Sequence, residues 1–475
     1  MLKILTFLLF FSITTHAQED LESIEKSVDE DKVLQNLADQ AKGISLNDAI
    51  EIGLRKNNQE MQRKYQFQLN ELNYQDAYEN FWFPKLNLTM QTTEDHFAEN
   101  LYRDSLDNAQ SSKTPTGYVG LEMPDYTLFN WGRDYLDYLV SKEAFTRNKQ
   151  IFQEQRRALR FNIITSYFNL VRLNNITKHY KKQLSHTSFI YKLAKEKLGL
   201  KKIRAQEYLQ AKAEFLKTHK YYQNSLYEYY SEQQVFAKYL GDDPETIYKP
   251  LDALKYKPIS IGKNESLKLV MQNSPQIKNA LSQLKRSNQS YEKALKDNMP
   301  LPKLSLKLGS YQRRFSSGGA NDSYETFTGS KNVEVAASVN MTWTIFGSGG
   351  LFNSRTTKRS YYGKRIAEIN LKEAQREMKV ANGLTHSRIL YLEKKHQATE
   401  AQLKNARKVF DQAIDNYIDS KSSFADMKNV LEELISANND IENVTYDHLV
   451  EKITYALVMG VDDFPGEKFE NLVEK

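Results

Sequence analysis

The chain has 475 residues, with 66 basic and 60 acidic side chains, no cysteine and 10 prolines. At roughly 100–200 residues per domain, this length allows two or three domains or one elongated one. A mean hydropathy of −0.65 and an apolar share of 40% indicate long, charged, solvated surfaces rather than one large core. The net charge of +6 is too dilute to indicate nucleic-acid binding, which concentrates basic charge on one face. The lack of cysteine excludes disulfides, thiolate metal sites, cysteine nucleophiles and a lipidated N-terminal cysteine.

Residues 1–17 have the pattern of a cleavable secretory signal. Lys3 precedes an apolar run from Ile4 to Ile13, and Ala17 is the small residue expected at the cleavage position. The run is far shorter than the roughly 20 apolar residues that a membrane-spanning helix needs, and no later segment approaches that length. We therefore expect an exported chain without a transmembrane helix.

An internal duplication organises the chain. Three patches recur in the same order at an offset of 216–218 residues: 46–61 with 263–277, 83–88 with 301–306, and 127–132 with 344–349. Constant order and spacing predict a tandem repeat with a period of about 217 residues. The first repeat is expected at 44–258 and the second at 259–460, followed by a tail at 461–475.

Both repeats have the same predicted order of elements. A helix of about 38 residues ends at Pro84 in the first repeat and at Pro300 or Pro302 in the second, because proline cannot continue a helix. Two strands of alternating apolar and polar residues follow in each repeat, at about 85–97 and 117–129 and at about 303–315 and 333–346. Long helical hairpins are expected at about 133–240 and 351–460, each with a long outgoing helix (about 133–197 and 351–418) and a shorter return helix.

The helix lengths carry a geometric expectation. At 1.5 Å per residue, each outgoing helix spans roughly 100 Å, whereas each return helix spans about 60 Å and the helix before the strands about 57 Å. Two shorter helices end to end therefore match one long helix. The break at 241–244 and the linker 245–262 should therefore lie midway along the helical part of the chain. Residues 18–43 and the tail should lie at the same level.

Four predicted strands per chain cannot close a β-barrel, and open sheet edges are not tolerated in lipid. If the strands cross a membrane, several chains must share one barrel, and three chains would supply about twelve strands, an even number in the usual range. Trp82, Trp131 and Trp343 all fall near the helical ends of the strands, where an interfacial aromatic belt would place them. Ordinary packing at a helix–strand junction is the alternative.

These features together resemble the TolC-type outer-membrane efflux and secretion channels. The resemblance rests on the duplicated halves, the Asn-rich step at 57–58, the Pro-Lys-Leu strand start at 84–86 and the Leu-Phe-Asn-Trp-Gly motif at 128–132, and it covers about 44–460. It implies an α+β membrane protein that forms a homotrimer: a twelve-stranded β-barrel, four strands per chain, continues into a periplasmic α-helical coiled-coil barrel. Residues 18–43 would be an N-terminal periplasmic segment.

The resemblance also implies a function. The protein would be a passive exit duct in the outer membrane of a Gram-negative bacterium, within a tripartite efflux or type I secretion system. A periplasmic adaptor and an inner-membrane pump of RND or ABC type would deliver small molecules or polypeptides to it.

In that family the helical tips close the duct like an iris, and rings of acidic side chains select what enters the duct and control its opening. Laid on that pattern, Tyr417 keeps the aromatic hydroxyl of the tip, while Ser420 replaces a glycine. Asp426 keeps the first of two carboxylates and Asn429 replaces the second. In the first hairpin, Arg204 stands where small polar residues can occur. The resemblance therefore assigns the gate to Tyr417, Asp426, Asn429 and Arg204.

Electrostatics gives Asp426 a separate rationale. Three copies around a narrow threefold axis would be like charges at close range, which attract cations. The first tip is basic (Lys201, Lys202, Arg204) and the second acidic (Asp411, Asp415, Asp419, Asp426), so we hypothesise a salt link between the tips. The alternative is that Asp426 is a solvated residue or an N-terminal helix charge.

No catalytic, cofactor or metal site is expected, and the chain is not predicted to be an enzyme. The eight histidines form no His-x-x-x-His pair. The glycine cluster 347–350 lacks both the spacing of a dinucleotide-binding motif and a Walker lysine-serine. Two other functions stay open: an exported coiled-coil scaffold or adhesin, and a periplasmic adaptor. The duplicated strand pairs, the aromatic border and the two hairpins favour the channel.

Overall fold

The computed structural model describes residues 41–92, 101–103, 109–111, 117–299, 301–309, 313–314, 336–342, 354–419, 421–465 and 467–474. The predicted signal peptide and Trp343 lie outside these residues. The chain divides into two compact units: the first combines the residues up to Arg63 with Glu154–Val270 and Lys379–Lys475, and the second combines Lys64–Gln153 with Met271–Met378. Each unit takes segments from both repeats, so the sequence repeats are not the compact units.

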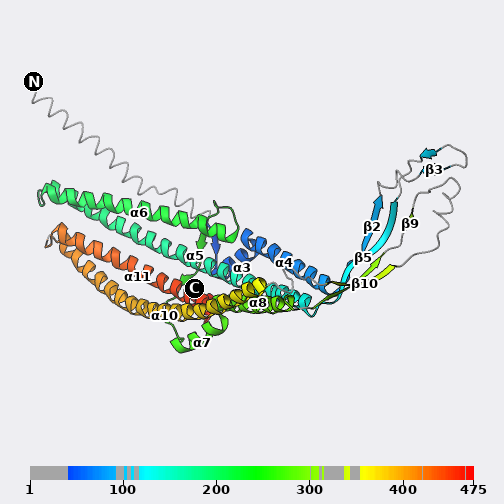
Figure 1. Cartoon of the computed structure of the whole chain (residues 1–475). Helices are drawn as coiled ribbons and strands as arrows, with labels where there is room; N and C mark the ends of the chain where they lie inside the picture. The colour runs from blue at the N-terminus through cyan, green and yellow to red at the C-terminus, as the bar shows by residue number, and fades with distance from the viewer. Residues whose placement is uncertain are drawn as a thin grey trace, which may run out of the picture. The chain divides into compact units, whose positions relative to one another are not determined.

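The second unit contains the main β-sheet (Figure 1). Its strands are β2 (Asn87–Thr92), β5 (Gly117–Phe129), β8 (Lys303–Gly309) and β10 (Ala336–Thr342). The strand order is β10-β8-β5-β2, and every neighbouring pair is antiparallel. The central pair, β5 and β8, joins one strand of each repeat.

The described part of the second unit has three shorter strands, one that joins this sheet and two that form a separate pair. The strand β9 (Arg313–Arg314) also pairs with β5, whereas β3 (Leu101–Arg103) and β4 (Ala109–Ser111) pair with each other.

The strand register gathers apolar side chains on one face of the sheet. Leu306 lies opposite Val339 on one side and Tyr126 on the other. Opposed residues of neighbouring strands project from the same face, and Val339 is 62% exposed. Pro124 lies at a register shift in β5, consistent with its missing N–H. The sheet therefore presents an exposed apolar face, as the alternating pattern predicts.

The connection from β5 to the first hairpin is a tight turn at Trp131 and Gly132. Both residues have positive φ, 55° and 75° respectively, which is uncommon for tryptophan. The indole Nε1 of Trp131 donates to the carbonyl oxygen of Pro302 at 3.1 Å. This bond ties the end of the strands in the first repeat to the start of the strands in the second, and Trp131 remains 41% exposed.

The two hairpins have closely matching helix lengths. The outgoing helices are α5 (Arg133–Gly199) and α10 (Ser354–Ile418), and the return helices are α6 (Ala205–Leu240) and α11 (Phe424–Met459). The outgoing helices have 67 and 65 residues and the return helices 36 each. Gly241 and Gly460 end the two return helices with left-handed φ angles of 77° and 70°, the usual helix C-cap. The helix positions lie close to those predicted.

The prediction of one helix of about 38 residues before each strand pair is wrong. The structure has two helices each time: α3 (Leu46–Lys56) and α4 (Asn58–Trp82), then α7 (Lys263–Asn273) and α8 (Pro275–Asp297). In the first repeat, the Nδ2 of Asn57 donates to the carbonyl of Tyr239 at 2.9 Å, while its Oδ1 accepts from the N–H of Gln59 at 2.9 Å. One side chain thus caps the end of α6 and the start of α4. In the second repeat, Pro275 begins α8, because it has no N–H to continue the preceding helix.

The linker pairs with the first and the last strand among the described residues. Strand β1 (Lys42–Ile44) pairs with β6 (Tyr248–Pro250), and β11 (Val473–Glu474) pairs with β7 (Ala253–Leu254). A short 3₁₀ helix, η2 (Phe469–Asn471), precedes β11. The linker and the tail therefore lie at the same level, as the helix lengths predict. Of the segment 18–43 predicted at that level, residues 18–40 lie outside the described residues. None of the helices described here combines the length and low polarity needed to cross a membrane.

Candidate gating site at the helical tips

Two turns join α5 to α6 and α10 to α11 (Figure 1). The predicted gate residues lie in these turns or in the helix ends beside them. Both turns close in the same way: the N–H of Lys202 donates to the carbonyl of Lys197, and that of Lys421 to the carbonyl of Asn416, each at 2.8 Å. Such bonds satisfy carbonyls that a helix end leaves free. In the first turn the left-handed position is taken by Lys201, with φ 58°.

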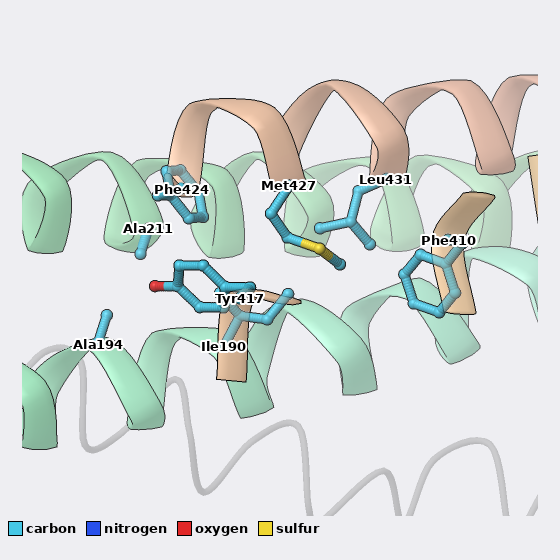
Figure 2. Close-up of a cluster of buried hydrophobic side chains, with 8 residues drawn as sticks. All are labelled: Ile190, Ala194, Ala211, Phe410, Tyr417, Phe424, Met427 and Leu431. Carbon is cyan, nitrogen blue, oxygen red and sulfur yellow. The ribbon is translucent and has the colours of Figure 1, made fainter. Parts of the chain in front are cut away.

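A cluster of buried apolar side chains, here called the tip cluster, joins the two turns (Figure 2). Its members come from all four hairpin helices: Ile190, Ala194, Ala211, Phe410, Tyr417, Phe424, Met427 and Leu431. On α11 they recur at the spacing of one helical face. Tyr417 and Phe424 are each 2% exposed, and their rings pack edge to face at 6.3 Å. The two hairpins therefore share one apolar core at their tips.

Lys197 makes a polar link between the hairpins inside this core. Its Nζ donates to the carbonyl oxygen of Tyr417 at 2.7 Å and lies 4.6 Å from the centre of the Tyr417 ring. The bond satisfies a carbonyl near the end of α10, where a helix favours positive charge. Burial, aided by nearby Lys202, lowers the pKa of Lys197.

Tyr417 contributes its ring and its carbonyl to the site. Among the described residues its hydroxyl, which the resemblance assigns to tip hydrogen bonding, has no hydrogen-bond partner. Burial raises the pKa of this hydroxyl.

A second polar link lies nearby on the return helices. Lys217 of α6 pairs with Glu432 of α11 at 2.6 Å, and Lys428 of α11 lies 3.9 Å from Glu214 of α6. Glu214 is 5% exposed, and burial raises its pKa despite the two lysines. The hydrogen bond between Lys217 and Glu432 raises the pKa of the lysine and lowers that of the glutamate. Both charges of that pair are therefore retained at neutral pH.

Asp426 has a structural partner in the N-cap residue of its own helix, Ser423. Its carboxylate Oδ2 lies 2.7 Å from the Oγ of Ser423 and accepts from the N–H of Ser423 at 3.3 Å, while Ser423 Oγ accepts from the N–H of Asp426. This reciprocal pair is a capping box at the start of α11. Asp426 and Asn429 are exposed on α11, and Arg204 is exposed as the N-cap residue of α6. Of the four predicted gate residues, the tip cluster includes Tyr417 alone.

The hypothesised salt link between the tips is not formed within the described part of one chain. Asp419 pairs with Lys421 of its own turn at 2.7 Å, and this bond lowers the pKa of Asp419. At the turns themselves, the hairpins are linked instead by the hydrogen bond from Lys197 to the carbonyl of Tyr417. A lysine in the last turn of a helix is a recognisable signal, but nothing local indicates a partner 220 residues away.

In the described residues, no group of three or more histidine, aspartate or glutamate side chains is arranged to hold a metal ion. The site is a packed junction of helices whose chemistry is apolar contact, ion pairing and hydrogen bonding.

Solved structures share this architecture. The outer membrane protein VceC of Vibrio cholerae is 14% identical, with a TM-score of 0.71 over 88% of this chain and 96% of that one. The Campylobacter jejuni CmeC outer membrane channel is 16% identical, with a TM-score of 0.69 over 87% and 85%. The chain has the fold of an outer-membrane channel. The Neisseria gonorrhoeae MtrE outer membrane channel, solved in an open state, agrees at 14% identity and a TM-score of 0.69 over 88% and 89%.

These likenesses confirm the predicted resemblance to the TolC-type channels at the level of the fold. No family model and no curated protein matches the sequence.

Proposed function

We propose that the chain is one subunit of a homotrimeric exit duct in the outer membrane of a Gram-negative bacterium. The observation that carries the proposal is the open sheet of the second unit. Among the described residues, the edge strand β2 pairs with β5 alone, and the edge strand β10 with β8 alone. Unpaired edges in lipid would be costly, so the edges need partners.

The strand directions suit partners of the same kind. Four strands that alternate in direction leave β2 and β10 antiparallel to each other. The β10 strand of one copy can therefore continue the antiparallel ladder beside β2 of the next copy. Such a head-to-tail contact closes into a ring when the rotation fits, and three copies give about twelve strands. The exposed apolar face of the sheet would then contact lipid.

Exposed apolar side chains on the helices also support contact between copies. On α10, Val380, Leu384 and Tyr391 are 59%, 68% and 60% exposed and recur at helical spacing. An apolar stripe of this kind on a solvent-exposed helix face marks an interaction site. Trp82 and Trp131, both partly exposed at helix–strand junctions, suit the border between lipid and water.

In this proposal the protein performs no chemistry and is a passive channel. A periplasmic adaptor and an inner-membrane pump of RND or ABC type would deliver small molecules or polypeptides. The packed tips would be the closed end of the duct, opened by separating the two hairpins as an iris. Asp426, exposed beside the tip cluster, would remain available to attract cations from three subunits.

Cysteine cross-linking tests the proposal directly, because the chain has no cysteine of its own. Leu88→Cys in β2 would be combined in turn with a cysteine at each position of β10, since one chain does not define the register between copies. Oxidation in outer-membrane fractions should yield disulfide-linked dimers and trimers for at least one pair. The matched control joins Leu88 to its partner Leu121 within the sheet and should cross-link inside single chains. Intermolecular products in none of the pairs, with the control intact, would contradict the proposal.

A further inference from the structure

A cavity of about 630 Å³ lies between the two hairpins, beside the tip cluster. One wall is formed by α5, and the other by α10 and α11. Its apolar lining consists of Phe410, Leu431, Leu434 and Ile435, of which the first two also belong to the tip cluster. The volume lies within the range of roughly 300–1,000 Å³ that small-molecule sites occupy.

The polar lining of the cavity is mostly basic. Lys178, His179, Lys182 and His186 project from one face of α5, and Arg407 joins them from α10. One carboxylate, that of Asp411, also lines the cavity. Within the part of the chain that the structure describes, neither lysine forms an ion pair.

Two of the other basic groups have only weak partners. His179 lies 3.6 Å from a carboxylate oxygen of Glu442, and Arg407 donates to the side-chain oxygen of Asn438 at 3.3 Å. The cavity thus has an excess of positive charge.

Two buried polar groups in the lining lack partners. Gln183 is 7% exposed, and its Oε1 has no hydrogen-bond partner among the described residues. The Nε2 of His186 is likewise unpaired, although its ring packs against Phe410 at 5.0 Å. Buried polar groups are normally satisfied, so each unpaired one needs an explanation such as an absent ligand.

We propose that this cavity binds an organic anion with an apolar body, such as an aromatic or aliphatic carboxylate. The body would contact Leu434 and the neighbouring apolar wall, and the anionic group would pair with Lys182 and Arg407. An anion at this position would also face the unpaired groups of Gln183 and His186. Inorganic cations are disfavoured by the basic lining, and a neutral apolar molecule would leave the basic groups uncompensated.

The site depends on both hairpins, which gives its occupation a consequence for the duct. Separating the hairpins would divide the cavity between α5 and the pair α10 and α11. A ligand stabilises the state to which it binds more tightly. The anion would therefore favour the packed, closed tips, a consequence that rests on the proposed duct function.

Titration of the detergent-extracted, full-length protein with naphthalene-2-carboxylate tests the site, with uncharged naphthalene-2-carboxamide as the matched ligand. Calorimetry should show saturable binding of the carboxylate and at least tenfold weaker binding of the amide. Lys182→Gln should weaken carboxylate binding about tenfold, and Leu434→Trp should abolish it by filling the cavity. Lys181→Gln, at an exposed neighbour outside the lining, should bind as the wild type does.

Circular dichroism and particle mass of each variant would show that it remains folded. Equal affinity for acid and amide, or unchanged binding in both Lys182→Gln and Leu434→Trp, would overturn the site. Conductance in lipid bilayers separates the two proposals: wild-type channels should close more often with the carboxylate, and Leu434→Trp channels should not respond. Saturable binding without that response would overturn the regulatory role. Recovery of the unliganded protein as a soluble monomer or dimer, and not as an outer-membrane trimer, would overturn the duct, whereas the titration would still decide the cavity.

Discussion

The link between Lys197 and the carbonyl of Tyr417 yields the most specific prediction about the tips. Lys197→Met keeps the aliphatic stem and the packing but removes the buried charge and its hydrogen bond. We expect the variant to favour separated hairpins, because this bond holds the end of α5 to the end of α10.

The magnitude follows from the contacts. A hydrogen bond from a charged group contributes about 1.5–3 kcal/mol, and the contact with the Tyr417 ring adds about 0.5–1 kcal/mol. Burial of the ammonium opposes both, as the lowered pKa of Lys197 indicates. A net loss of about 2 kcal/mol would raise the ratio of open to closed tips roughly 30-fold, since every 1.4 kcal/mol is a factor of ten.

Single-channel recording in lipid bilayers measures this ratio. The matched control is Lys195→Met, an exposed lysine on the same helix, which should behave as the wild type. If Lys197→Met and Lys195→Met channels open equally often, the buried link does not hold the tips. The reasoning from the structure would then be refuted.

Three further predictions concern caps and charge. Asn57→Ala removes a side chain that caps two helix ends, and in denaturant titrations it should lower the free energy of unfolding by about 2 kcal/mol. An equal loss in Asn58→Ala, at the neighbouring position, would contradict the capping role of Asn57. Asp426→Asn keeps an acceptor for the capping box but removes the charge, so cations should no longer block its conductance while its stability is retained. Asp426→Ala should lose both the cation block and the stability from the capping box. Cation block that is unchanged in both variants would make the gate assignment wrong. Burial and nearby Lys452 lower the pKa of His448 to about 4. His448 therefore stays neutral in the folded chain, whereas in the unfolded chain it takes up a proton below about pH 6.5, so the free energy of unfolding should fall by up to about 3 kcal/mol between pH 6.5 and 4. A His448→Gln variant whose stability has the same pH slope as the wild type would show that His448 is not the cause.

The periodicity of the chain is enough to predict most of the helices and strands. Proline-free stretches rich in charged residues and leucine predicted the long helices, and alternation predicted the strands of the sheet. The sequence does not predict the helix break at Asn57, for a physical reason. The repeat marks Asn57 as a polar step, but its partner, the carbonyl of Tyr239, is 182 residues away and is brought close only by tertiary packing.

The candidate site shows the same division between local and long-range information. The resemblance to a family pattern predicts Tyr417 and Asp426 as gate residues, and the capping box of Asp426 is a local motif in the sequence. The links from Lys197 to Tyr417 and from Lys217 to Glu432 are not local, because each joins residues of different repeats. Opposite charges on the two turns predict a salt link, yet the carboxylate of Asp419 pairs with its own neighbour Lys421, which costs less chain entropy than a distant partner.

The most direct test of the proposed function is the particle mass of the mature chain after fractionation of the membranes and extraction in detergent. The open sheet edges predict three chains per particle, recovered from the outer-membrane fraction. A soluble monomer or dimer in the periplasm would leave β2 and β10 without partners and would contradict the duct.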